Sequence, residues 1–213
     1  MPAGARCAVL VTSRSEYGAP GGRTVRVREL ATPDAVRLLA NLVGHRRVDA
    51  EREAAVDIVR LAGNLPLAVR AAAARLAAVP DWSLERFARL LSEPATRLRE
   101  LRADDLDLQA RYDACYERLD EREKWTFRLL ALTGGRPFRP PDVAELLGCP
   151  PLVVEIVLAR LVECHLLELV ADPARGPARY AFSGLARCYA MERLAGVVVP
   201  GADALMAGGR APG

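Results

Sequence analysis

The sequence contains very little lysine. Lys124 is the only lysine, and arginine supplies all the other side chains that are permanently positive. A P-loop, the phosphate-binding motif G-x-x-x-x-G-K-[S/T], needs a lysine that follows glycines, but Lys124 stands in E-R-E-K-W with no glycine nearby. There is also no apolar strand ending in paired aspartates that could hold magnesium. Because phosphoryl transfer depends on such parts, we expect no hydrolysis of ATP by this chain.

Several other features are scarce. Aromatic residues make up 5% of the chain, so the core must be built mainly from Leu, Val and Ala. The five cysteines include no C-x-x-C pair, and His45 and His165 are isolated, which argues against a disulfide framework or a metal site. The apolar runs are too short for a signal peptide or a membrane span. We therefore expect a cytoplasmic protein with reduced thiols and no membrane partner.

The first thirty residues carry two strand-like patterns. Residues 8–12, A-V-L-V-T, form a short apolar run typical of a buried parallel strand. Residues 24–30, T-V-R-V-R-E-L, alternate apolar and polar side chains, as an edge strand does. Two such strands cannot form a stable parallel sheet alone, so this region is interpreted as the end of an α/β domain.

From residue 31 the pattern is helical. Thr32 and Pro33 predict a helix start, with the threonine as the cap. Near the C-terminus, two strand-like runs flank the turn signal D-P-A-R-G-P, which predicts a hairpin. The predicted helices begin at Thr32 and cover 50–62, 66–79, 83–92, 104–119, 121–133, 140–147, 152–164 and 185–194, and the predicted hairpin strands are 166–170 and 178–182.

These patterns predict a mainly α fold with four parts. Residues 1–30 would be a remnant of an α/β sheet, and residues 31–103 a helical bundle with short connections. Residues 104–195 have the order of a winged helix, with helices followed by a two-stranded hairpin. The Gly/Ala-rich residues 196–213 are expected to be a disordered tail.

A conspicuous break in the helical pattern is G-N-L-P-L-A at residues 63–68. Gly63 and Asn64 favour a left-handed turn that ends one helix. Pro66 is suited to the first position of the next helix, where its missing N–H leaves no unsatisfied donor. This stretch is consistent with a plain helix junction, and equally with a ligand-contacting corner of the same conformation.

An ordered set of motifs resembles the C-terminal part of the NB-ARC module of STAND ATPases, particularly the copies in bacterial SARP-type transcriptional activators. The set comprises V-L-V-T-S-R at 9–14, G-N-L-P-L-A at 63–68, W-S-L at 82–84, Y-E-R-L at 116–119, F-R-L-L-A-L at 127–132 and R-Y-A-F-S-G-L at 179–185. The resemblance implies that residues 1–30 are a remnant of an α/β nucleotide-binding sheet. It also implies an ADP- or ATP-responsive switch that works with a protein partner or as an oligomer.

The resemblance assigns roles to six residues. Arg14 would sense the terminal phosphate, although an arginine at a strand end can equally be solvated or paired with a carboxylate. Gly63, Leu65, Pro66 and Leu67 would lie against the adenine. Ser183 occupies the position of a histidine that contacts the ADP β-phosphate, and Gly184 replaces the aspartate after it. Serine cannot carry that charge, so the resemblance implies weakened nucleotide binding here.

The sequence leaves three hypotheses for the function. The first is a nucleotide-sensing regulatory fragment without hydrolysis. The second is a DNA-binding winged-helix transcriptional regulator, but the candidate recognition helix 152–164 carries Glu155, Arg160 and Glu163, an unfavourable charge for reading bases. Direct DNA binding is therefore not expected. The third, an ATPase proper, conflicts with the missing P-loop.

Overall fold

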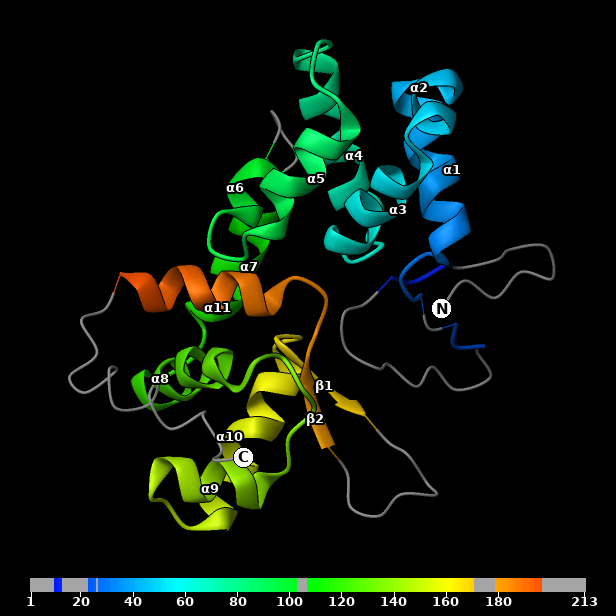
Figure 1. Cartoon of the computed structure of the whole chain (residues 1–213). Coiled ribbons are helices and arrows are strands. Elements are labelled where there is room, and N and C mark those ends of the chain that lie inside the picture. The colour runs from blue at the N-terminus through cyan, green and yellow to red at the C-terminus, as the bar shows by residue number, and fades with distance from the viewer. Residues whose placement is uncertain (1–9, 13–22, 26, 103–106, 171–178, 197–213) are drawn as a thin grey trace, which may run out of the picture.

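The computed structural model describes residues 10–12, 23–25, 27–102, 107–170 and 179–196, and this part of the protein is mainly helical with a small two-stranded sheet (Figure 1). Its elements are, in order, α1 (Thr32–Val43), α2 (His45–Ala50), α3 (Arg52–Leu61), α4 (Pro66–Ala78), α5 (Leu84–Ser92), α6 (Arg97–Glu100), α7 (Leu108–Tyr116), α8 (Glu121–Leu130), the 3₁₀ turn η1 (Ala131–Thr133), α9 (Pro140–Leu147), α10 (Pro151–Glu163), β1 (Leu167–Val170), β2 (Arg179–Phe182) and α11 (Ala186–Ala195).

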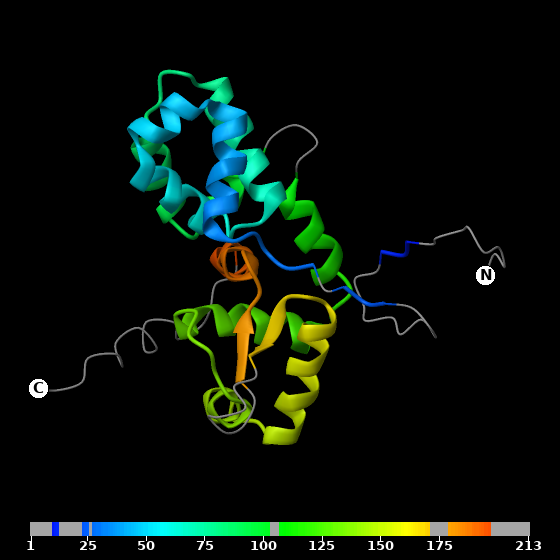
Figure 2. The same cartoon turned by 90° about the vertical axis from the view of Figure 1, so that its right-hand side faces the viewer.

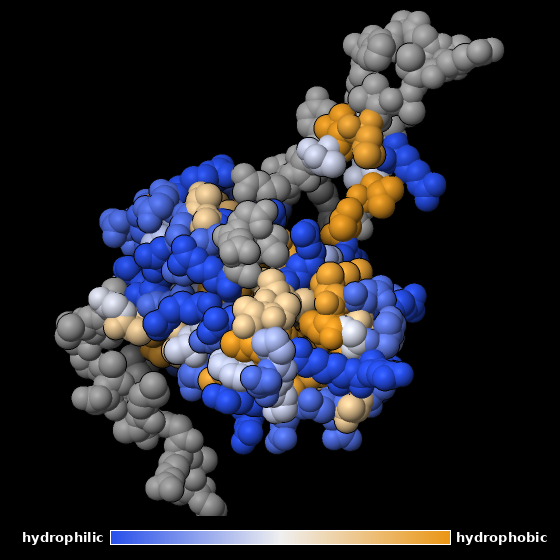
Figure 3. All heavy atoms as spheres, turned by 90° about the horizontal axis from the view of Figure 1, so that it is seen from above, coloured by the Kyte–Doolittle hydropathy of each residue, from blue (hydrophilic) through white to orange (hydrophobic). Residues whose placement is uncertain are grey.

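Helices α1 to α5 pack against one another as a first group. Helix α1 contacts α3 and α4, and α3 contacts α5. The alanine-rich helix α4 allows close approach, because its buried positions are mostly alanines (Ala68, Ala71, Ala72, Ala73). Phe87 of α5 fills the interior of the group and is fully buried, a contribution of about 1.5–3 kcal/mol. Seen from above, the outer surface is dominated by hydrophilic residues (Figure 3).

Helices α8 to α10 and the hairpin form a second group. Strands β1 and β2 are antiparallel, with Leu167 opposite Phe182 and Val170 opposite Arg179. Phe138 forms an isolated bridge with Tyr180 on the other side of β2. The ring centroid of Phe127 lies 5.7 Å from that of Phe182 and 6.3 Å from that of Tyr189. Helix α8, the hairpin and α11 therefore share one aromatic cluster.

Helix α11 lies between the two groups (Figures 1 and 2). The short helix α6 contacts α5 on one side and α7 and α11 on the other. The guanidinium of Arg97 in α6 donates to the carbonyls of Leu91 (2.5 Å) and Ser92 (3.1 Å) at the end of α5, and to the Cys188 thiol of α11 (3.4 Å). Arg97 therefore ties the first group to α11 by side-chain hydrogen bonds.

The predicted strands near the N-terminus are wrong in the residues that the structure describes. Residues 10–12, 23–25 and 27–30 carry no strand, and 92% of Leu10 and 91% of Val27 are exposed. A strand needs a neighbouring strand for its backbone hydrogen bonds. In the described part of the chain, no strand lies beside these segments to supply them. The remaining residues of both predictions lie outside the described ranges.

Most helix predictions are confirmed, with corrections at the ends. Helix α9 has the predicted bounds, and Ser83 caps α5, its hydroxyl accepting from the Arg86 N–H at 3.1 Å. The predicted helix over 50–62 begins later, because Glu51 has φ −130° and separates α2 from α3. The predicted helix over 104–119 covers only Leu108–Tyr116 among the described residues.

Three further features are the start of α7, the predicted tail and the predicted hairpin. Helix α7 is capped by Asp107, whose carboxylate accepts from the Ala110 N–H at 3.0 Å. The predicted tail, apart from Gly196, lies outside the described residues. The hairpin strands are confirmed as antiparallel, each close to its predicted position.

Candidate functional site

The turn at Gly63 and Asn64 ends α3 as the sequence predicts. Both residues have positive φ, +65° and +52°, a conformation that glycine and asparagine tolerate better than most. The Asn64 N–H donates to the Val59 carbonyl at 2.8 Å, and the Gly63 N–H to the Arg60 carbonyl at 2.9 Å. These bonds satisfy carbonyls at the end of α3. Pro66 then begins α4 as its first residue.

The same turn is fixed to the residues before α1. The Leu30 N–H donates to the Asn64 carbonyl at 3.1 Å, and the Asn64 amide lies 3.4 Å from the Thr32 hydroxyl. The prediction that Thr32 caps α1 is wrong, because Ala31 is the cap residue and no side-chain bond is made there. The Thr32 hydroxyl instead faces Asn64, which holds the α3–α4 turn against the start of α1.

The second candidate segment, Ser183 to Leu185, connects β2 to α11. The Ser183 hydroxyl donates to the His165 carbonyl at 2.5 Å, and the Ser183 N–H to the Leu166 carbonyl at 3.3 Å. The Leu185 N–H donates to the phenol oxygen of Tyr112 at 3.1 Å. The Ser183 hydroxyl therefore donates its one proton to a backbone carbonyl. In this arrangement it has no proton left to donate to a ligand.

The fold brings these two segments together. A Cβ placed on Gly63 would lie 3.7 Å from the Cα of Gly184, and one placed on Gly184 would lie 3.2 Å from Cδ1 of Leu65. Gly63, Leu65 and Ser183, which the sequence analysis assigned to one site, are thus on adjoining turns. Pro66 is exposed, and Leu67 is partly buried. We call the residues Gly63–Leu67 and Ser183–Leu185 the glycine corner.

Tyr112 of α7 completes the glycine corner and was not among the residues predicted for the site. Its ring stacks on that of Tyr189, with centroids 5.4 Å apart and planes 25° apart. Burial raises the pKa of Tyr112 to about 12, while its bond from the Leu185 N–H acts in the opposite direction. The phenol is therefore neutral at physiological pH. No sequence motif distinguishes Tyr112 from a tyrosine that only fills the core.

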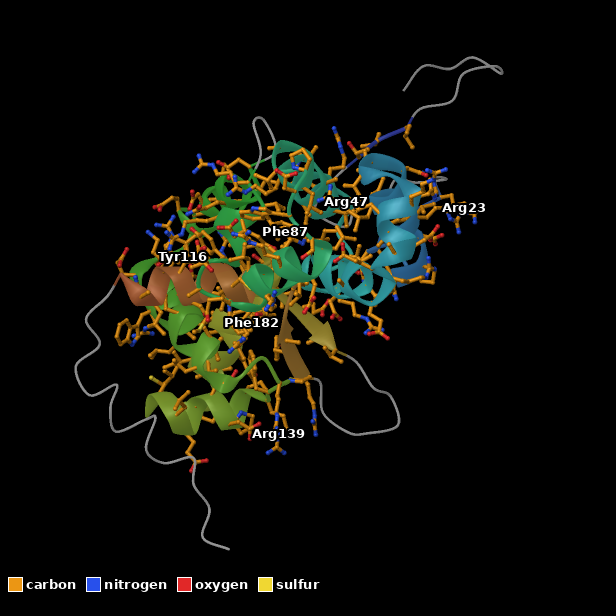
Figure 4. All side chains as sticks on the ribbon, turned by 45° about the horizontal axis from the view of Figure 1, so that its top comes forward. Arg23, Arg47, Phe87, Tyr116, Arg139 and Phe182 are labelled. Carbon is orange, nitrogen blue, oxygen red and sulfur yellow. The ribbon has the colours of Figure 1, made fainter. Side chains whose placement is uncertain are left out.

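Three arginines lie apart from the glycine corner or outside the described residues. Arg14 lies outside the described residues, so its predicted role stays a prediction. Arg47 lies beside the α4–α5 connection, where it donates to the Trp82 carbonyl at 2.6 Å (Figure 4). Arg139 lies toward the end of the hairpin remote from α11 (Figure 4) and pairs with Asp142 at 2.7 Å.

Two surface hollows in the described part of the chain lie away from the glycine corner. One shallow hollow is lined by side chains of α1 to α3, among them Pro33, His45 and Arg52, and another lies along α3. Neither is lined by a residue of the glycine corner. Among the described residues, no group of three or more His, Cys, Asp or Glu side chains is placed to hold a metal ion. No helix in the described ranges is long and apolar enough to cross a membrane.

Two regulatory proteins are similar to this chain. No protein-family model matches the chain. The chain is 39% identical over 191 residues, 89% of its length, to the regulatory protein AfsR of Streptomyces griseus. It is 37% identical over 86% of its length to the regulatory protein AfsR of Streptomyces coelicolor. These matches cover 19% and 18% of the two proteins, so the chain spans about a fifth of the relatives it matches. The chain is homologous to AfsR over most of its length.

Proposed function

We propose that this chain is the regulatory part of a nucleotide-responsive transcriptional regulator, built as the C-terminal portion of an NB-ARC module. The observation that carries the proposal is the glycine corner, where Gly63 and Leu65 adjoin Ser183 and Gly184. The resemblance assigned the first segment to the adenine and Ser183 to the position that contacts the β-phosphate of the same nucleotide. The homology to AfsR supports the regulatory role. Cytoplasmic location belongs to the same proposal.

The proposed nucleotide contacts are apolar on one side and polar on the other. The exposed ring of Pro66, with Gly63, Leu65 and Leu67, would lie against the base, and Arg14 would face the phosphates. Ser183 would lie at the phosphate end of the nucleotide without donating to it, because its hydroxyl donates to the His165 carbonyl. Binding of ADP is expected to be weak. The P-loop is missing from the sequence, and the backbone N–H groups of such a loop supply much of the phosphate affinity. No hydrolysis is proposed.

The hairpin group is proposed to be a winged helix that packs against protein rather than DNA. The outward positions of α10 include Leu152 and Ile156, which are 68% and 64% exposed, and the exposed Glu155. Arg160, the basic residue of this helix, is paired with Glu163 at 2.8 Å. Base edges are usually read by Arg, Lys, Asn or Gln, so this surface favours a protein partner or an oligomer contact.

The test is thermal unfolding of the purified chain with increasing ADP. A dissociation constant near 1 mM would give about 1.4 kcal/mol of stabilisation at roughly 10 mM ADP. For a chain of this size that is a rise in Tm of about 3–6 °C. No stabilisation is expected at micromolar ADP. A flat response up to the highest ADP concentration would contradict nucleotide binding.

A matched pair of variants locates the effect. Pro66 begins α4 and Pro151 begins α10, and both are exposed prolines at the first helical position. Replacing either with alanine changes the helix start in the same way. Only Pro66→Ala should reduce the ADP-dependent rise in Tm, because only Pro66 lies in the glycine corner. An equal loss in Pro151→Ala would place binding elsewhere.

A further inference from the structure

Helix α10 carries an exposed apolar stripe on the side that faces away from the core. Leu152, Ile156 and Ala159 stand at positions i, i+4 and i+7, so they line one side of the helix. Leu152 is 68% exposed and Ile156 is 64% exposed, and Ala159 is exposed as well. The opposite side of the helix is fully buried at Leu158 and Leu161. We call Leu152, Ile156 and Ala159 the α10 stripe.

A further exposed leucine lies just before α10. Leu146, near the end of α9, is 43% exposed, and only residues 148–150 separate α9 from α10. Figures 1 and 2 show both helices at the end of the described part opposite α1 to α5, so the first group does not cover them. Single exposed leucines are common on protein surfaces, whereas apolar side chains gathered in one place mark a contact surface.

A carboxylate beside the α10 stripe has no cation to neutralise it. Glu155 is exposed and precedes Ile156 in the helix. Arg160, the basic residue of α10, has its guanidinium 2.8 Å from the carboxylate of Glu163. Among the described residues, no Lys, Arg or His side chain forms an ion pair with Glu155. The α10 stripe therefore has a negative edge.

This charge disfavours a second copy of the chain as the partner. A two-fold symmetric contact places the same surface on both partners. Two copies would bring two Glu155 carboxylates to one apolar contact, while each Arg160 is already paired with Glu163. Like charges brought together at an interface repel each other and weaken binding. A partner with positive side chains beside its own apolar surface complements the α10 stripe better.

We propose that the α10 stripe docks an amphipathic helix of a partner protein, and that a Lys or Arg side chain of that helix pairs with Glu155. Positions i, i+4 and i+7 are those by which one helix packs on another. The small side chain of Ala159 lets the second helix come close to α10. This inference rests on the proposed protein-binding role of the hairpin group and names the chemistry of the partner.

The test measures the binding of two model peptides to the full chain. Each peptide has about 18 residues, enough for a helix to form, with leucines at i, i+4 and i+7. One peptide carries lysines beside the leucines, and the other carries glutamates at the same positions. Binding is followed by fluorescence anisotropy of the labelled peptide at about 0.15 M salt, where distant charges are screened. The lysine peptide should bind about tenfold more tightly, because the glutamate peptide brings like charge to Glu155.

Two pairs of variants locate the binding. Ile156→Gln should weaken binding of the lysine peptide about tenfold, because it removes apolar surface from the contact. Leu42→Gln, at an exposed leucine of α1, should leave the affinity unchanged. Glu155→Gln should reduce the preference for the lysine peptide to about threefold. Glu53→Gln, at an exposed glutamate of α3, should preserve that preference. All four side chains are exposed, so the variants should unfold at the wild-type temperature.

Several results would overturn the docking of a basic helix. These are no binding of the lysine peptide, equal binding of the two peptides, or equal affinity of Ile156→Gln and Leu42→Gln. A concentration-dependent dimer that Ile156→Gln abolishes would also overturn it, because a second copy would then occupy the α10 stripe. Binding of duplex DNA that is lost in Ile156→Gln would contradict the proposed protein-binding role itself. Because no ADP is added, failure of the ADP titration leaves this test unaffected.

Discussion

Arg97 provides the most direct test of how the two helix groups are held together. Its guanidinium is partly buried in α6 and donates to two carbonyls at the end of α5 and to the Cys188 thiol of α11. Arg97→Met keeps much of the side-chain length and removes all of these donors. The carbonyls of Leu91 and Ser92 would then depend on water or remain unpaired.

The expected cost follows from the two carbonyl bonds. Each hydrogen bond contributes about 0.5–1.5 kcal/mol net, so Arg97→Met should lower the free energy of unfolding by roughly 1–3 kcal/mol. At about 2–4 °C per kcal/mol for a chain of this length, the loss of Tm is several degrees. The thiol contact is weaker and is left out of this sum. Burial raises the pKa of Cys188, so its thiol remains protonated beside the guanidinium.

The assay is urea unfolding followed by circular dichroism, with Arg89→Met as the control. Arg89 is an exposed arginine of α5, so its replacement should change the free energy of unfolding by less than about 0.5 kcal/mol. Arg97→Lys should fall between the two, because lysine keeps the charge but loses the planar set of donors. If Arg97→Met unfolds at the same urea concentration as Arg89→Met, the junction does not depend on these bonds.

Two further predictions concern local structure in the second group. Asp120 and Glu123 form a reciprocal capping box at the start of α8, with both bonds at 2.8 Å, so Asp120→Ala should cost about 0.5–2 kcal/mol in urea unfolding, and a neutral effect would contradict the cap. The hydrogen bonds from Arg139 hold the pKa of Asp142 below its usual value of 3.8. A depressed carboxyl pKa stabilises the fold above the unfolded pKa, and this stabilisation is lost as pH falls through the folded pKa. In Arg139→Ala, an NMR titration of Asp142 should show a higher midpoint, and an unchanged midpoint would contradict the pairing.

Local sequence signals account for most of the helices and the hairpin. Ser83, Pro66 and Pro140 mark helix starts, and Gly63 with Asn64 marks a helix end, because each residue type satisfies or avoids backbone groups that lack helical partners. The predictions that were wrong depend on residues far away along the chain. Thr32 looked like a cap, but Asn64 from another helix turn lies beside its hydroxyl. The residues near the N-terminus have the alternation of a strand, but alternation cannot supply the partner that a strand requires.

At the candidate site, too, some features follow from the local sequence and others only from the fold. The sequence by itself determined the left-handed turn at Gly63 and Asn64 and the proline start of α4, because these depend on the backbone preferences of single residues. Only the tertiary structure decided that Leu65 meets Gly184 and that Tyr112 supports the contact, since these residues are far apart along the chain and carry no shared local signal. It also decided that the Ser183 hydroxyl bonds to the His165 carbonyl, because that bond requires the return of β2 beside β1.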